Sequence, residues 1–418
     1  MKILIWHGYL LSGTGSNVYT RSLARAWSRQ GHEVVVLSQE RHPERFDLGG
    51  SLAVRPEIGP HLPVFVLDDY EAVRPQLLQD LTRPQLDNYV ARNAAAIADH
   101  LPGDFLLTNH VLMGGPVGAA AGLPFAVKAH GSELEFSMRG RPGLGAWANE
   151  TLSGAQAVIA GSEHIVRVLG EVVGAGDYVE RICVGPPGVD VEEFRPEERA
   201  SALRALIDEC RLDAPHPTRR NNQRLPDAGN AERFASFFAE DRPTAVFVGK
   251  LSAEKGVSLL IDAVRRLDLR TVVVGFGPAR RELEQAAGDN VLFSGPLEHR
   301  HLRHLWPLAD VSVVPSVFPE AFGMVAAEAA SCGSPPLVAR HSGLAEVAAA
   351  LEVEYPAEQR HLASFDTGDV ADLSAKLDEI VSLPGEQWQA VSESARRTVV
   401  RNWSWEHVAT TITDVMAT

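Results

Sequence analysis

The sequence contains few cysteines and no long hydrophobic run. Its 418 residues include only three cysteines, and the spacing of Cys183, Cys210 and Cys332 matches neither a zinc site nor a disulfide framework. No stretch approaches the roughly 20 apolar residues that a transmembrane helix needs. The sequence therefore predicts a soluble protein of the reducing cytoplasm, without disulfides and without a membrane span.

Basic residues are also in short supply. Lysine and arginine number 39 against 54 aspartates and glutamates, so the formal net charge is −15. Because nucleic acids are polyanions, we do not expect a chain of this charge to bind them nonspecifically. A helix predicted over residues 16–30 nevertheless places Arg21, Arg25 and Arg29 on one face. That face has three interpretations: ordinary solvation, weak contact with an anionic membrane surface, and attraction of a phosphorylated acceptor.

Short apolar runs alternate with helical patterns along the chain, which is typical of parallel α/β layers. The Pro- and Gly-rich segment at 185–190 marks an interdomain connection, and the polar residues 211–230 predict an exposed insertion. We expect the first run to be a buried strand rather than a signal peptide, since it is short and weakly basic. The predicted strands are residues 2–6, 33–38, 105–108, 125–129, 157–160, 180–184, 244–248, 271–275, 291–293, 311–314 and 336–338.

Two glutamates stand eight positions apart in the segment EAFGMVAAEAASCG, which begins at Glu320. The Ala-rich run places Glu328 more than a turn inside a helix, whereas Glu320 lies on the preceding loop. Eight helical residues span roughly 12 Å, so the two carboxylates suit separate hydroxyl groups of one elongated ligand. The free N–H groups of the helix N-terminus between them can bind a diphosphate.

Two lysines follow another predicted strand. In TAVFVGKLSAEKG the apolar run breaks at Gly249 and is followed by Lys250 and Lys255. Ligands of open α/β sheets bind at the carboxyl edge of the strands, and lysine ammonium groups are suitable partners for phosphate oxygens. The sequence therefore predicts a diphosphate site at this edge.

These segments resemble a known family. The runs VGKLSAEKG, EAFGMVAAEAASCGSP and VGPPGVDVEEFRP are similar to those of the retaining nucleotide-sugar glycosyltransferases of family 4. That resemblance implies an α/β fold of the GT-B type, with two Rossmann-like parallel-sheet domains facing a central cleft. The implied parts are an acceptor domain at 1–185, a donor domain at 186–400 and a C-terminal helix at 401–418 that crosses back to the first domain. Many family members carry proline where this chain has Ala321 and arginine where it has Lys250.

The resemblance also implies roles for individual residues. Glu320 would contact the donor sugar near its reacting carbon, Glu328 would bind the ribose, and Lys250 and Lys255 would neutralise the diphosphate. His130, after a predicted strand, would contact a sugar hydroxyl. His110 also follows a predicted strand, and from that position we expect it to line the acceptor side. The further substrate-binding residues are Gly13 and Gly15 in a glycine-rich loop, Gly249 at a strand end, Gly295 and Leu297 in the turn that holds the base, and Phe322, Gly323 and Met324 through backbone amides.

Histidines 299, 301 and 304 resemble a metal-binding group at first sight. No cysteine or carboxylate with ligand spacing follows them, and arginines are interleaved, so we interpret them as the solvated face of a helix. No Asp-x-Asp motif accompanies the sugar site either. We therefore expect no metal site, no cofactor and no requirement for a divalent metal.

The expected activity is retaining transfer of a hexosyl group from a UDP- or GDP-sugar to a hydroxyl of a small-molecule, glycan or lipid-linked acceptor. Three alternatives remain open: a phosphorylase of the same fold, a noncatalytic sugar-nucleotide binder, and a nicotinamide oxidoreductase that would use the Gly13-x-Gly15 turn. The sequence fixes neither the base nor the sugar, the acceptor or the oligomeric state. The expected location is the cytoplasm, with membrane contact through the arginine face as an open variant.

Overall fold

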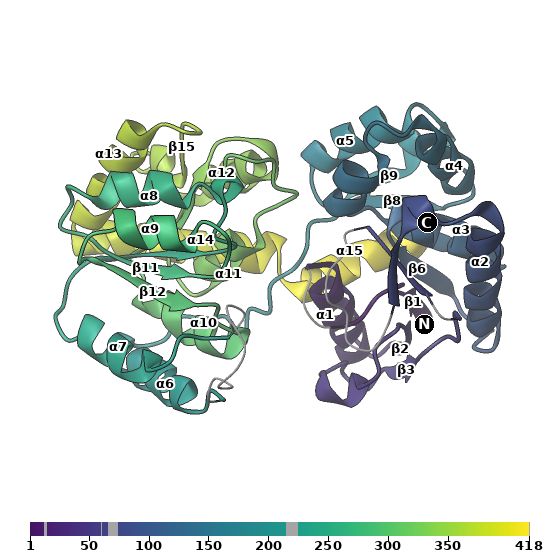
Figure 1. Ribbon diagram of the computed structural model, residues 1–418, viewed down its shortest axis with the longest axis horizontal. Helices are drawn as coiled ribbons and strands as arrows, with labels where there is room; N and C mark the ends of the chain where they lie inside the picture. Colours follow the sequence, from purple (N-terminus) through teal and green to yellow (C-terminus); the bar gives the residue numbers. More distant parts are fainter. Residues whose placement is uncertain (12–14, 60, 66–73, 215–224, 418) are drawn as a thin grey trace. The chain divides into compact units, whose positions relative to one another are not determined.

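The computed structural model describes residues 1–11, 15–59, 61–65, 74–214 and 225–417 (Figure 1). The chain divides into two units. The first consists of Met1–Gly188 and Trp405–Thr418, and the second of Val189–Ser404. Each unit has its own parallel sheet and its own hydrophobic core, so each is described by itself.

The first unit is built on a seven-stranded parallel sheet in the order β3-β2-β1-β6-β7-β8-β9, with a separate parallel pair β4-β5. Its strands are β1 (Lys2–Trp6), β2 (Glu33–Leu37), β3 (Leu52–Val54), β4 (His61–Val64), β5 (Arg74–Leu77), β6 (Phe105–Asn109), β7 (Phe125–Lys128), β8 (Ala157–Ala160) and β9 (Ile182–Val184). Its helices are α1 (Gly15–Arg29), α2 (Arg83–Ala98), α3 (Val111–Ala120), α4 (Pro142–Leu152), α5 (Glu163–Val173) and α15 (Trp405–Ala417).

The alternation of side chains along β1 shows why this sheet is covered on both faces. Leu4 and Trp6 belong to one buried cluster with α2 to α5, whereas Ile3 and Ile5 belong to another with α1 and α15. Successive side chains of a strand point to opposite faces, so an all-apolar strand needs a helical layer on each side. The last helix is fastened to α1, where the indole Nε1 of Trp27 donates to Oγ1 of Thr413 over 2.9 Å.

The second unit has a six-stranded parallel sheet in the order β12-β11-β10-β13-β14-β15. Its strands are β10 (Thr244–Val248), β11 (Arg270–Val274), β12 (Val291–Gly295), β13 (Val311–Val314), β14 (Pro336–Ala339) and β15 (Ser364–Phe365). Its helices are α6 (Arg199–Arg211), α7 (Asn230–Phe237), α8 (Val257–Val264), α9 (Arg280–Ala286), α10 (His299–Leu305), α11 (Met324–Ser331), α12 (Ser342–Glu354), α13 (Val370–Ser382) and α14 (Gly385–Asn402).

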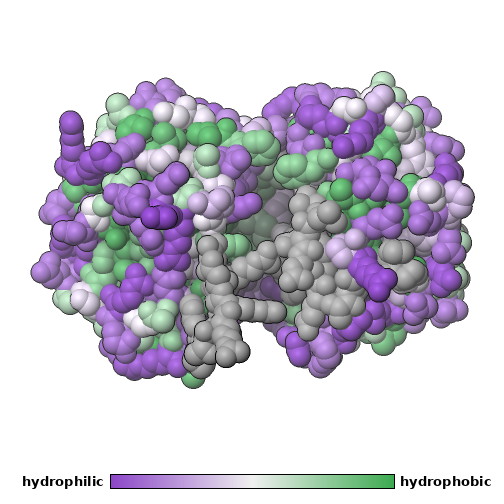
Figure 2. All heavy atoms as spheres, in the orientation of Figure 1, coloured by the Kyte–Doolittle hydropathy of each residue, from purple (hydrophilic) through white to green (hydrophobic). Residues whose placement is uncertain are grey.

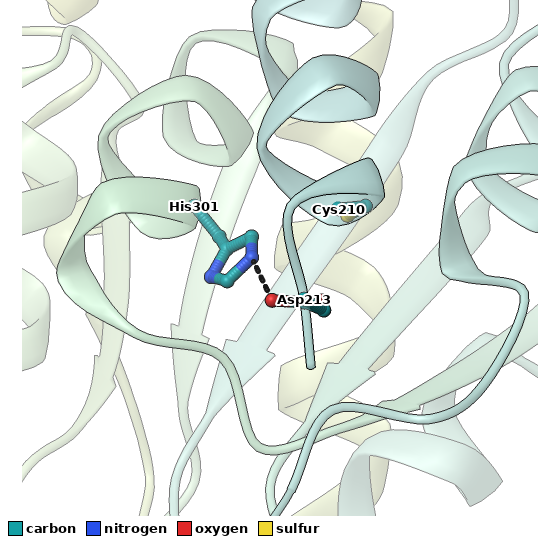
Figure 3. A group of neighbouring side chains, drawn as sticks. All are labelled: Cys210, Asp213 and His301. Carbon is teal, nitrogen blue, oxygen red and sulfur yellow. Dashed lines mark hydrogen bonds and ion pairs between the residues drawn. The ribbon is translucent and has the colours of Figure 1, made fainter. Parts of the chain in front are cut away.

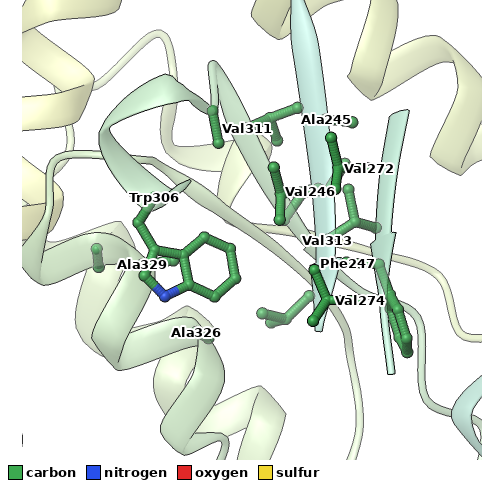
Figure 4. Close-up of a cluster of buried hydrophobic side chains, with 14 of the residues drawn as sticks. Ala245, Val246, Phe247, Val272, Val274, Trp306, Val311, Val313, Ala326 and Ala329 are labelled. Atoms are coloured by element: carbon green, nitrogen blue, oxygen red, sulfur yellow. The ribbon is translucent and has the colours of Figure 1, made fainter. Parts of the chain in front are cut away.

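Helix α11 packs closely beside the core of the second unit because its inner face is made of alanines. Figure 4 shows the fully buried indole of Trp306 next to Ala326 and Ala329, while valines of β10, β11 and β13 fill the space beyond. Small side chains leave room for the large ring and bring the helix backbone near the sheet. This packing places the N-terminus of α11 at the carboxyl edge of the strands.

The parallel α/β architecture predicted from the sequence is confirmed, and all eleven predicted strands are present with ends shifted by two residues at most. Among the described residues, four strands were not predicted. Among them, β3 and β15 are only three and two residues long, and β4 and β5 contain Pro63 and Pro75. Short runs and prolines give a weak strand pattern, so tertiary pairing decides these strands.

Charged and polar side chains are spread over the face of each unit shown in Figure 2. Among the described residues, no helix has both the length and the apolar character needed to cross a membrane. On the basic face of α1, Arg25 and Arg29 lie 3.6 and 3.8 Å from the carboxylate of Asp47. Much of this positive charge is therefore balanced within the unit, which favours the interpretation as an ordinary solvated face.

Candidate functional site

In the second unit, the predicted Glu320 and Lys255 meet at the carboxyl edge of the sheet. Glu320 follows β13 and Lys255 follows β10, and these strands are neighbours. The Nζ atom of Lys255 donates to Oε1 of Glu320, and the two side chains are 34% and 22% exposed. The structure thus brings a cation and a carboxylate together where a ligand can reach both. Lys250 lies on the same loop as Lys255 and is exposed.

The loops that carry Lys255 and Glu320 are joined by backbone hydrogen bonds. The carbonyl oxygen of Glu254 accepts from the N–H groups of Val317 (2.9 Å) and Phe318 (3.2 Å). Gly256 then starts α8 with a φ of +64°, and a Cβ at that position would lie 1.9 Å from the carbonyl oxygen of Pro315. Only glycine allows this approach, so Gly256 fixes the distance between the lysine turn and the Glu320 loop.

A directed chain of hydrogen bonds holds the backbone of Glu320. The carbonyl oxygen of Ser316 can only accept, so His341 carries its proton on Nε2, which lies 2.7 Å away. Its Nδ1 then accepts from the hydroxyl of Ser342 at 3.0 Å. The Ser342 oxygen in turn accepts the N–H of Glu320 at 2.9 Å. Sequence reasoning missed His341 and Ser342, although a serine that opens a helix three positions after the end of a strand was an available signal.

Glu328 lies inside α11, as predicted, and is buried with 8% of its side chain exposed. Burial raises the pKa of this carboxyl to about 8, with a smaller contribution from the charge of Glu193. The Nε2 atom of His299 lies 3.6 Å from the carboxylate. At the start of the same helix, Gly323 has a φ of +134°, and the ring of Phe322 packs edge-on against Trp403 at 5.2 Å. The first N–H groups of α11 have no intrahelical acceptors, so this end of the helix can receive an anion.

Glu328→Gln should raise the melting temperature of the ligand-free protein by about 5 °C at alkaline pH and by little at acidic pH. The folded-state pKa of about 8 lies above the ordinary 4.5, so the folded protein holds the proton more tightly and loses stability as the pH rises between these values. Glutamine removes this loss. Calorimetry of the wild type and the variant across this pH range measures the difference in melting temperature. Glu282→Gln, at an exposed position, is the control. An identical pH dependence in the variant and the wild type would contradict burial of an ionisable Glu328.

The predicted base-binding turn at Gly295 and Leu297 is hydrogen-bonded to the last residues of the polar segment 211–230. The carbonyl oxygen of Ser294 accepts from the N–H of Asp227 and from Nδ2 of Asn230, both at 2.9 Å. A Cβ on Gly295 would lie 2.6 Å from Oδ1 of Asp227. The prediction of an exposed insertion over 211–230 is therefore wrong for residues 225–227 and 230, which fold against this turn, and for Asp213, which is half-buried. Residues 215–224 lie outside the described part of the chain.

The interpretation of the histidines on α10 as a solvated face is wrong for His301, which is fully buried. Figure 3 shows its ring beside Asp213 and near Cys210. Nδ1 accepts the N–H of Glu298 at 3.2 Å, so Nε2 carries the proton and donates to Asp213 at 3.1 Å. Arg300 also pairs with Asp213. A metal ion would need the lone pair of Nε2 and would face the guanidinium charge, so the donor set suits a hydrogen-bonded network better than a metal.

In the first unit, the rings of three histidines lie close together at the carboxyl edge of the sheet. His7 follows β1, His110 follows β6 and His130 follows the end of β7. The ring of His110 lies 4.5 Å from that of His130 and 6.0 Å from that of His7. Burial lowers the pKa of His7 to about 4, and burial together with neighbouring positive charge holds the pKa values of His110 and His130 well below 6.5. All three rings are therefore neutral at physiological pH.

A buried glutamate that was not predicted organises this edge. Glu133 is fully buried, and its carboxylate accepts from the N–H groups of Val111 (2.7 Å), Leu112 (3.1 Å) and His130 (3.3 Å). It thus closes the N-terminus of α3 and holds the His130 loop at once. His110 starts α3 with a φ of +71°, and its ring is 1% exposed. The signal available in the sequence was the short spacing of Glu133 from His130.

The structure places the remaining predicted residues as follows. Gly15 begins α1 and is exposed, whereas Gly13 lies outside the described residues. Gly249 follows β10, and its N–H donates to the carbonyl oxygen of Val274 at 3.0 Å. Leu297 and Met324 are half-buried. The predicted site residues that the structure describes therefore form two groups, one near the carboxyl edge of the sheet in each unit.

Known families match both halves of the chain. The model described as "Glycosyltransferase Family 4" matches residues 13–193, and the one described as "Glycosyl transferases group 1" matches residues 230–398. A D-inositol 3-phosphate glycosyltransferase from Xylanimonas cellulosilytica is 28% identical over 80% of this chain and 77% of its own length. The protein of the same name from Mycolicibacterium smegmatis is also 28% identical, over 94% of this chain and 83% of its own.

Solved structures share the fold over nearly the whole length. Sucrose-phosphate synthase from Thermosynechococcus elongatus superposes with a TM-score of 0.68 at 20% identity and covers 100% of this chain and 98% of its own. HepE from Anabaena, solved in complex with UDP, also gives a TM-score of 0.68, at 16% identity, with 100% of both chains covered. At these identities the likeness concerns the fold alone. With both halves matched by glycosyltransferase families, the chain belongs to the family 4-like glycosyltransferases and has the two-domain α/β fold known as GT-B.

Proposed function

We propose that the protein transfers a hexosyl group from a UDP- or GDP-sugar to an acceptor hydroxyl with retention at the anomeric carbon. The observation that carries this proposal is the pairing of Lys255 with Glu320 beside the open N-terminus of α11. A cation and helix N–H groups suit a diphosphate, and the partly exposed carboxylate suits sugar hydroxyls. The HepE structures with UDP and UDP-glucose support a nucleotide-sugar donor.

The reaction breaks the bond between the anomeric carbon and the diphosphate oxygen and forms a bond from the same carbon to the acceptor oxygen. Negative charge grows on the departing phosphate, and Lys255, Lys250 and the N–H groups of Phe322, Gly323 and Met324 would stabilise it there. We propose a front-face route, in which a leaving-group oxygen takes the acceptor proton. Glu328 would bind the ribose and the turn at Gly295 and Leu297 the base. No metal enters this scheme, and we propose that none is required.

The first unit would supply the acceptor side. We assign to His130 a hydrogen bond to a sugar hydroxyl, and to Gly13 and Gly15 the loop near the diphosphate or acceptor. The relatives named D-inositol 3-phosphate glycosyltransferases make a polyol phosphate the first acceptor to test. A dependence of turnover on inorganic phosphate would instead favour a phosphorylase.

Thermal-shift measurements of the purified protein with UDP, GDP, ADP, CDP, TDP and NAD(H), each with and without magnesium, test the donor. A ligand that binds only the folded state raises the free energy of unfolding, by about 2.7 kcal/mol at 100 times its Kd, and so raises the melting temperature. We expect one nucleoside diphosphate to stabilise the protein without magnesium. Stabilisation by NAD(H) alone would contradict the proposal and return attention to Gly13 and Gly15 as a cofactor turn.

A further inference from the structure

The side chain of Asn109 contacts the ring of His130 at the edge of the first sheet. Asn109 is fully buried at the end of β6, and its Oδ1 lies 2.9 Å from Nε2 of His130. Its Nδ2 donates to the carbonyl oxygen of Trp6 at 3.4 Å. Because that carbonyl can only accept, the amide nitrogen must face Trp6 and the amide oxygen must face His130. An amide oxygen can only accept as well, so Nε2 of His130 carries a proton.

The surroundings keep His130 from taking up a second proton. Burial and the positive charge of Lys128 lower the pKa of the ring well below 6.5. The other titratable groups around it are His7, the neutral His110, the ring of Tyr19 at 5.8 Å and the carboxyl of Glu133, which accepts the His130 backbone N–H. Since a neutral imidazole holds one proton and Nε2 has it, Nδ1 holds a lone pair. Among the described residues, Nδ1 has no hydrogen-bond partner.

The backbone of His130 is held as firmly as its ring. Glu133 binds the His130 N–H together with the first two N–H groups of α3, which begins directly after His110. Strands β6 and β7 pair with each other, and Asn109 lies opposite Lys128 in their register. Asn109 and Glu133 therefore connect the ends of these two strands. The orientation of the ring is fixed before any ligand arrives.

We propose that Asn109 is a positioning residue for sugar transfer: it holds His130 with the proton on Nε2 and thereby presents Nδ1 as an acceptor to a sugar hydroxyl. This inference rests on the proposed function, in which His130 contacts the sugar. A histidine in the other tautomer would offer Nδ1–H and could bind only an acceptor atom. Asn109 thus determines the direction of the hydrogen bond that His130 makes.

The decisive variant is Asn109→Asp, which keeps the size of the side chain, adds a charge and removes the Nδ2 donor to the carbonyl oxygen of Trp6. A carboxylate still accepts from Nε2–H, but it favours the doubly protonated ring, so the pKa of His130 rises and Nδ1 gains a proton as the pH falls. We expect kcat/KM of the variant to approach the wild-type value near pH 9 and to fall about 10- to 100-fold below it near pH 6. The matched control is Asn88→Asp, at an exposed position of α2, which should leave the profile unchanged.

Lys128, whose pKa is lowered to about 7 by burial, and Glu133, whose pKa is raised to about 8 by burial, titrate in the same window. The added carboxylate acts on these groups as well, so a change in the pH profile is assigned to His130 only where the NMR signals of its ring titrate over the same pH range. Nitrogen-15 NMR of histidine-labelled wild-type protein, with His130 assigned by loss of its signals in His130→Asn, reads the tautomer without any activity. Protonation at Nδ1 in the wild type would overturn the inference, whether or not Asn109→Asp folds. If Asn109→Asp transfers sugar with the same pH profile as the wild type, the inference is overturned as well. A wild type that binds no sugar nucleotide would refute the proposed function instead, and with it the catalytic meaning of the tautomer.

Discussion

Glu320→Ala should lower kcat by about 100- to 1,000-fold in a protein that remains folded. The carboxylate lies at the carboxyl edge of the sheet, paired with Lys255, and its backbone is held by the hydrogen bond to Ser342. A group positioned in advance is worth most when charge develops in the transition state, because no reorganisation is needed at that moment. Since the side chain is 22% exposed and fills no core position, its loss should cost little stability.

Initial rates of nucleoside diphosphate release, with the donor identified by thermal shift, measure this effect. Glu282→Ala, at an exposed position of α9 in the same unit, is the matched control and should keep wild-type kcat. Glu320→Gln separates charge from shape, because it keeps the volume and leaves Lys255 without its carboxylate. If Glu320→Ala retains near-normal kcat with an unchanged melting temperature, Glu320 has no part in the chemistry.

The elements of the fold and part of the site could be predicted because their signals are local. The buried strands are continuous apolar runs, and the two lysines directly follow one of them, so the run that ends at Val248 already places Lys255 at a sheet edge. The position of Glu328 inside a helix follows from its alanine neighbours in the same way. Such patterns report the state of a segment without any knowledge of its neighbours.

The supporting residues could not be predicted because their contacts join distant segments. Ser342 holds the backbone of Glu320 from 22 positions away, since β13 and β14 are neighbours in the sheet. Glu133 reaches the N-terminus of α3 only because β6 and β7 are adjacent.

His301 was predicted to be solvated and is buried. The arginines beside it suggested solvent, but Asp213, at the end of another helix, covers its ring. Burial of a polar side chain is decided by what packs on it, and that partner is 88 positions away in the sequence. No local pattern carries this information.

Lys255→Met should lower kcat/KM for the donor by roughly 100-fold, and Lys250→Met should lower it less. The ammonium group of Lys255 is held by Glu320 in a partly buried position, whereas Lys250 is exposed and its charge is better screened by water. Lys255→Arg keeps the charge but not the point geometry, so we expect partial activity. Arg281→Met, at an exposed position of α9, controls for the loss of one positive charge from the unit.

The double variant Glu320→Gln, Lys255→Met tests whether the pair acts as a unit. Each single change leaves one charge without its partner, so part of each effect comes from the misplacement of the other residue. We therefore expect the double variant to be about as slow as the slower single variant, rather than slower by the product of both factors. Strictly multiplicative effects on kcat/KM would show that the carboxylate and the ammonium act independently. The pairing would then be a feature of the empty site, and the diphosphate would engage Lys255 after displacing Glu320.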